Sequence, residues 1–193
     1  MKKMPPFFAI AFFAIVGLLF SKVNAQSTPG TMTFNVTTTS TGNYSPKHVV
    51  AIWIEDANGI FVKTKLRQAV ARKQWLATWI TKSAENVVDA TTGATLANHT
   101  APITVSWNGT NVAGTLVPDG TYKVGIQMAW SNANGPVSYF TFTKGTTPFS
   151  STPTATSNYT AMTLTWNPAV AVVASAAPTT ICKGSTTQLT ATP

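Results

Sequence analysis

Apolar and polar residues alternate along most of the chain, which is the pattern of strands with one buried face. In the segment 31–37, Met32, Phe34 and Val36 alternate with polar residues. The segment 48–55 is apolar on both of its faces, as expected for a central strand that is covered on both sides. The Asn-Gly pair that follows it readily adopts positive φ angles, so residues 48–66 are predicted to form a β-hairpin.

Further strand patterns occur at 102–107, 121–130, 137–143 and 159–166. About seven short strands separated by turn residues predict a mainly β protein, a single immunoglobulin-like antiparallel β-sandwich.

The one helical pattern, at 70–82, predicts a short helical insertion between strands. Leu76, Trp79 and Ile80 follow one another at spacings of three and four residues. Trp75 and Trp79 would be neighbours on this helix, so they are a candidate stacking platform for a sugar. The alternative is that they pack the helix onto a sheet.

The stretch 106–124 is rich in glycine, and each glycine has a backbone explanation. A phosphate-binding loop is normally followed by a helix, whereas a strand follows here. Asn108, Asn111 and Asp119 supply only one carboxylate and lack EF-hand spacing, so no metal site is expected. We therefore assign structural roles in turns and the core to these residues and to one earlier tryptophan: Trp53, Trp107, Gly109, Gly114, Asp119, Gly120 and Tyr122. The inward-facing or turn-packing positions of the sandwich are expected to include Trp53, Trp107, Tyr122, Val124 and Ile126.

The N-terminal segment 1–25 has the pattern of a signal peptide. Lys2 and Lys3 precede an uncharged run, Phe7 to Phe20, and small residues end the segment at Ala25. The run is shorter than the ~20 residues that span a bilayer. The sequence thus predicts an exported protein, periplasmic, at the cell surface or secreted, with no stable membrane anchor after cleavage.

The 193-residue chain has 13 basic and five acidic residues, and removal of Lys2, Lys3 and Lys22 with the signal would leave ten basic ones. Five of these cluster, namely Lys63, Lys65, Arg67, Arg72 and Lys73. The cluster could meet an anionic polysaccharide or a membrane surface, or it could simply be solvated. Export argues against nucleic acid as a partner.

Few residues are suited to acid–base chemistry, so no enzyme activity is expected. Glu55 and Asp56 are adjacent, and on a strand their side chains point to opposite faces. His48 and His99 belong to no recognisable ligand spacing, and a Gly-x-Ser-x-Gly motif is absent from the sequence.

After residue 168 the composition changes. Residues 26–168 are predicted to form the sandwich domain, 169–178 a linker, and 179–193 the incomplete start of a second immunoglobulin- or PKD-like repeat. This last segment resembles the first strand of repeats in bacterial surface adhesins. The lone Cys182 in an exported chain leads us to expect a fragment of a longer protein whose residues 169–193 are poorly packed.

The stretch 106–124 also resembles the immunoglobulin-like signature of flagellar hook-capping proteins. Together with 44–64, the Leu76-to-Trp79 segment and 92–95, it makes the chain resemble domain-of-unknown-function family 2271, predicted periplasmic proteins. That resemblance implies an exported β-sandwich with no established reaction. Relatives sometimes accompany flavin- or haem-linked membrane components.

The segment 89–95, Asp-Ala-Thr-Thr-Gly-Ala-Thr, resembles the acceptor pattern at which a transferase joins FMN phosphate to a hydroxyl, with Thr95 at the ester-forming position. It departs from the pattern at Ala90, where glycine is usual. The sequence alone favours a structural or adhesive module without a cofactor that binds a protein or glycan partner. A periplasmic accessory subunit of a redox system, with Thr95 as a flavin acceptor, is the alternative.

Overall fold

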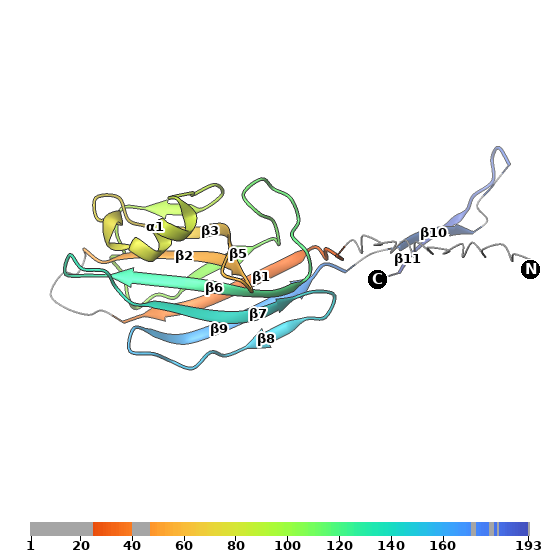
Figure 1. The fold of residues 1–193 in the computed structure, drawn as a ribbon. Coiled ribbons are helices and arrows are strands. Elements are labelled where there is room, and N and C mark those ends of the chain that lie inside the picture. Colours follow the sequence, from red (N-terminus) through yellow and green to blue (C-terminus); the bar gives the residue numbers. More distant parts are fainter. Residues whose placement is uncertain (1–24, 40–46, 171–172, 178–179, 181, 193) are drawn as a thin grey trace, which may run out of the picture.

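The computed structural model describes residues 25–39, 47–170, 173–177, 180 and 182–192. The predicted signal peptide lies outside these ranges except for its last residue. Within them the chain is mainly β, and two sheets pack face to face as the sequence predicts (Figure 1).

The first sheet has four strands in the order β5-β1-β9-β8. These are β1 (Gly30–Thr38), β5 (Ile103–Trp107), β8 (Phe149–Ser151) and β9 (Tyr159–Pro168). All three pairings are antiparallel, and a register shift interrupts β1 and β9 between Asn35 and Thr37.

The second sheet has five strands in the order β4-β3-β2-β6-β7. These are β2 (Val49–Asp56), β3 (Phe61–Gln68), β4 (Thr91–Gly93), β6 (Gly120–Ala129) and β7 (Val137–Lys144). The short edge strand β4 runs parallel to β3, so the sandwich is antiparallel except at this edge.

The predicted hairpin at 48–66 is formed by β2 and β3. Gly59 has a φ of +80°, and the Gly59 amide donates to the Asp56 carbonyl at 3.1 Å. Two register shifts in the β2–β3 pairing then change which β3 side chains face the interior.

The main hydrophobic core lies between the two sheets. Trp107, Tyr122, Val124 and Ile126 are all buried there, as expected for inward-facing positions. The Trp107 ring lies 5.3 Å from the Tyr122 ring, measured between centroids. Aromatic side chains from both sheets therefore fill this end of the sandwich.

A second, smaller core lies on the outer face of the five-stranded sheet, beneath α1 (Figure 1). Trp53 belongs to this core, together with Trp79 and Leu76. The prediction that Trp53 faces the sandwich interior is therefore wrong. Because β2 is apolar on both faces, alternation could not indicate which face meets the other sheet.

The helical insertion is shorter than the predicted 70–82. It consists of a 3-10 turn, η1 (Lys73–Trp75), followed by α1 (Ala77–Ser83). Leu76, with φ −98° and ψ 50°, separates the two, and a left-handed Ala84 ends α1. Leu76 is fully buried. The residue at which the helix is interrupted is therefore also a residue of the core.

Beyond the sandwich, β10 (Val173–Ala177) and β11 (Gln188–Thr192) pair with each other as a separate two-stranded sheet. Figure 1 shows this hairpin beyond one end of the sandwich. The segments predicted as a linker and as the opening of a new repeat are thus joined by strand pairing. Leu189 is 76% exposed, in keeping with the expected poor packing of this region.

Candidate functional site

The segment that resembles a flavin acceptor lies at one edge of the five-stranded sheet. Its middle part is β4, which pairs in parallel with β3 so that Thr91 lies opposite Leu66 and Thr92 opposite Arg67. Thr91 and Thr92 are both exposed. The segment is consequently presented on an open edge and not enclosed by neighbouring strands.

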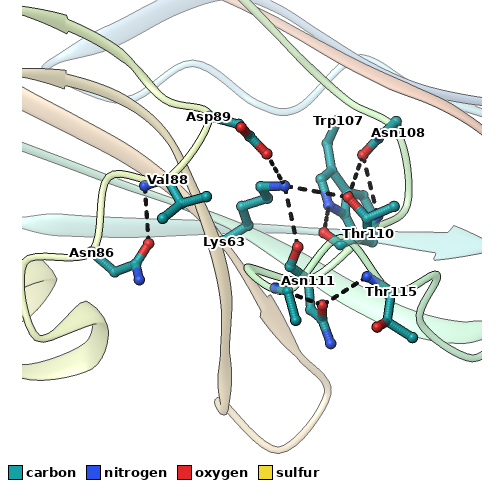
Figure 2. A network of polar contacts seen from close by, with 10 residues as sticks. Lys63, Asn86, Val88, Asp89, Trp107, Asn108, Thr110, Asn111 and Thr115 are labelled. Atoms are coloured by element: carbon teal, nitrogen blue, oxygen red, sulfur yellow. Dashed lines mark hydrogen bonds and ion pairs between the residues drawn. The ribbon is translucent and has the colours of Figure 1, made fainter.

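The first residue of the segment, Asp89, is fixed by a buried lysine (Figure 2). The Lys63 ammonium donates to Asp89 Oδ2 at 2.7 Å, and the Lys63 side chain is only 2% exposed. The hydrogen bond and the charge of Lys63 lower the pKa of Asp89 below its usual value. The ion pair therefore favours the ionised form of Asp89 and connects the segment to β3.

The same ammonium also donates to Thr110 Oγ1 at 3.3 Å and to the Asn111 carbonyl at 3.2 Å. Figure 2 shows how Lys63 bridges the acceptor-like segment and the glycine-rich stretch. Trp107 Nε1 donates to the Thr110 carbonyl at 2.7 Å, so this loop is in turn tied to the core. The sequence indicated each of the two segments but not this contact, because nothing in Lys63 itself distinguishes it from the other basic residues of its cluster.

Backbone hydrogen bonds hold Thr95 from both sides. The Val70 amide donates to the Ala94 carbonyl at 3.1 Å, and the Leu96 amide donates to the His48 carbonyl at 2.7 Å. Leu96 is buried in the main core. Thr95 is half-buried, and backbone hydrogen bonds hold the residues on both sides of it in place.

Thr95 lines an open pocket of about 450 Å³ between the end of β4 and the start of β5. Its walls combine apolar and uncharged polar side chains, from Leu66, Gln68, Thr91, Thr95, Leu96, Ala97, Asn98, Ala101, Pro102, Ile103 and Thr104. This volume falls in the range of small-molecule sites, roughly 300–1,000 Å³.

Two histidines lie beside the pocket. His48 Nδ1 and His99 Nε2 are 2.7 Å apart, and His99 Nδ1 is 2.8 Å from Thr38 Oγ1. Burial, and then the charge of His48, lower the pKa of His99. This chain of contacts links the loop that carries Asn98 to β1 and to the residue before β2, which the sequence did not predict.

The residues of the basic cluster make different contacts. Lys63 is buried in the ion pair described above, and Lys73 forms an ion pair with Glu85. Burial, and then the charge of Lys63, lower the pKa of Lys65. Arg67, opposite Thr92, places positive charge beside the acceptor-like strand.

A family model described as predicted periplasmic protein, domain-of-unknown-function family 2271, matches residues 31–161. The match covers all of the acceptor-like segment and most of the sandwich. The chain belongs to this family of predicted periplasmic proteins. No curated protein and no solved structure matches it. In the described ranges the helices are too short to cross a membrane.

The tryptophans of this family-2271 chain do not form the predicted stacking platform. Trp79 is fully buried, and its Nε1 donates to Thr64 Oγ1 at 3.0 Å. Trp75 packs against the same small core and is partly buried. The rings therefore hold the helical insertion on the sheet, which is the alternative that the spacing left open.

The turn residues of the glycine-rich stretch have structural contacts. Gly109 and Gly114 both have a φ of +79°, and the Tyr122 hydroxyl donates to the Pro118 carbonyl at 2.6 Å. Asp119 Oδ1 accepts from the Thr28 amide at 2.7 Å and from Lys144 Nζ at 2.6 Å. Within the described ranges no group of three or more His, Cys, Asp or Glu side chains gathers as metal ligands.

Proposed function

We propose that this protein is a non-enzymatic periplasmic carrier of a flavin, with FMN joined through its phosphate to Thr95. The observation that carries the proposal is the position of Thr95. It ends an acceptor-like segment on an open sheet edge, and it lines a pocket of small-molecule size.

The walls of the pocket around Thr95 fit a flavin in their composition. The pocket offers apolar surface from Leu66 and Ile103 beside amide groups from Gln68 and Asn98, as a flat ring with polar edges requires. A bound flavin would supply one- and two-electron redox chemistry, which no side chain of this pocket can provide.

The chain's own part in attachment is to present a hydroxyl. The Thr95 oxygen forms a new bond to the FMN phosphorus of a flavin dinucleotide supplied with a separate transferase. The bond from that phosphorus to the AMP half breaks, AMP leaves, and the hydroxyl proton passes to a base of the transferase. Lys63, Asp89 and the backbone bonds on both sides of Thr95 keep the segment in one conformation for that reaction.

Co-expression with a flavin transferase in a bacterial periplasm tests the proposal. The purified wild-type protein is expected to be yellow after denaturation and desalting, because the flavin is covalent. Thr95→Val should be colourless, and Thr95→Ser should retain colour. Thr91→Val is the matched control, since Thr91 also lines the pocket but occupies the variable position of the pattern. A yellow Thr95→Val protein, or a colourless wild type, contradicts the proposal.

A binding module for protein or glycan is the second candidate function. It is favoured by a separate groove on the outer face of the five-stranded sheet, which exposes one tyrosine among charged and polar side chains. The adhesive role suggested by the C-terminal segment belongs to this candidate. A glycan ligand at the groove does not depend on a flavin at Thr95.

A further inference from the structure

An open groove of about 350 Å³ lies where α1 leaves the outer face of the sheet uncovered. It is lined by Glu55, Asn58, Gly59, Lys82, Lys123, Tyr139 and Thr141, and it shares no lining residue with the Thr95 pocket. Strands β2, β6 and β7 form its floor, with Glu55 opposite Lys123 and Lys123 opposite Thr141. Three polar side chains therefore stand in a row across the sheet.

Glu55 places a carboxylate in this groove, although its side chain is only 2% exposed. Its Oε1 accepts from Trp53 Nε1 at 2.7 Å, and its Oε2 lies 3.4 Å from Lys82 Nζ. The Tyr139 hydroxyl lies 3.4 Å from Oε1, which is a long hydrogen bond. Three donors therefore surround the buried Glu55 carboxylate, which holds Lys82 and Tyr139 in place at the groove.

Tyr139 forms an aromatic wall of the groove. Its side chain is 41% exposed, and its ring stands at 87° to the Trp53 ring with 5.9 Å between centroids. Trp53 lies over Gly125, where a Cβ atom would come within 2.4 Å of the indole. The Tyr139 ring is thus supported by a rigid neighbour while part of it faces solvent.

The groove carries more positive than negative charge. Lys82 pairs with Glu55 and also donates to the Gly59 carbonyl at 2.7 Å. Lys123 takes part in none of the four ion pairs found among the described residues. Its ammonium can therefore pair with an acidic group of a ligand.

We propose that this groove binds an acidic sugar, a hexose ring that carries a carboxylate. The ring packs against Tyr139, its hydroxyls contact the exposed side chains of Asn58 and Thr141, and its carboxylate pairs with Lys123. Each of these contacts uses a different part of the sugar, and one aromatic ring among polar and charged side chains suits a ring that carries hydroxyls and a carboxylate. A neutral sugar would leave Lys123 unused.

Nuclear magnetic resonance titration of the full exported chain with trigalacturonic acid tests this site. Saturable shifts are expected for the amides of Lys123, Tyr139 and Thr141. Tyr139→Ala and Lys123→Gln should each weaken binding about tenfold, the effect of losing roughly 1.4 kcal/mol. Tyr139→Phe should bind nearly as well as wild type, because the ring remains.

Two controls keep the result specific. Lys183→Gln removes one positive charge from the C-terminal region and should leave the affinity unchanged. A neutral trisaccharide of galactose should bind about tenfold more weakly than the acidic one. The proposal would be overturned by equal affinity for the two probes or by undiminished binding of the Lys123→Gln variant. It would also be overturned if trigalacturonic acid caused no shifts.

Discussion

Gly125 is a position on β6 where the structure has no room for a side chain. A Cβ atom there would lie 2.4 Å from Trp53 Cε2, and the indole is fully buried and hydrogen-bonded to Glu55. Gly125→Ala should therefore lower the free energy of unfolding by about 1–3 kcal/mol through overpacking. Urea denaturation measures the change.

Gly145→Ala is the control for that substitution, because a Cβ at Gly145 meets nothing within 4 Å. Its effect should stay within about 0.5 kcal/mol. Equal stability of the two variants would show that Trp53 can move off β6, which would also remove the support inferred for Tyr139.

At the scale of single residues, the sequence identified the buried aromatic residues Trp107 and Tyr122 but assigned Trp53 to the wrong core. It also treated Asp119 only as a turn residue. The side chain of Asp119 joins the N-terminal segment at Thr28 to the end of β7 at Lys144. Contacts between residues 25 or 91 positions apart leave no mark in a local pattern.

At the scale of elements, the Asp119 carboxylate joins the segment before β1 and the turn before β6 to the end of β7, so its removal should be destabilising. The Lys144 side chain is fully buried, so Asp119→Asn leaves its charge uncompensated. The expected loss is about 3–5 kcal/mol in the free energy of unfolding at neutral pH.

The same variant should change the acid dependence of stability. Burial acts to raise the pKa of Asp119, but the hydrogen bonds from Lys144 and Thr28 outweigh it and lower the pKa below the usual 3.8. A carboxyl group with a lowered pKa stabilises the fold above its unfolded-state pKa, and this contribution is lost as the pH falls through the folded-state value. Wild type should lose more stability than Asp119→Asn below about pH 4. Parallel acid-unfolding curves would contradict this role.

Seven strands of the sandwich could be predicted from their patterns of apolar residues, whereas β4 and β8 could not. Each of these two has three residues, too few to show a period, and each forms by pairing with a longer strand. The helical period over 70–82 was present in the sequence, but the backbone at Leu76 interrupts it. Packing between elements therefore determines where β4 and β8 form and where the helix is interrupted.

At the scale of the whole molecule, the sandwich should be independent of the C-terminal hairpin. Deletion of residues 171–193 is expected to shift the melting temperature by no more than about 2 °C, because the described residues of that region are mostly exposed. A matched deletion that begins at Tyr159 removes β9 from the first sheet and should prevent folding. A large destabilisation by the shorter deletion would show that the hairpin supports the sandwich.

The acceptor-like motif at 89–95 could be found in the sequence, but its position in the fold could not be predicted. The letters of the segment 89–95 could be read directly, and the family match includes them. The sequence did not show that Lys63 attaches Asp89 to β3, or that Thr95 lines a pocket between β4 and β5. Both depend on the parallel pairing of β4, a tertiary contact.

Peptide mass spectrometry of the mature protein, isolated from the periplasm of its own cells, shows whether Thr95 carries a flavin. The peptide containing Thr91 to Thr95 is expected to carry one FMN, linked as a phosphate ester, with fragment ions that locate it on the Thr95 oxygen. Recovery of that peptide wholly unmodified, or with the flavin on any other residue, would show that Thr95 is not a flavin acceptor.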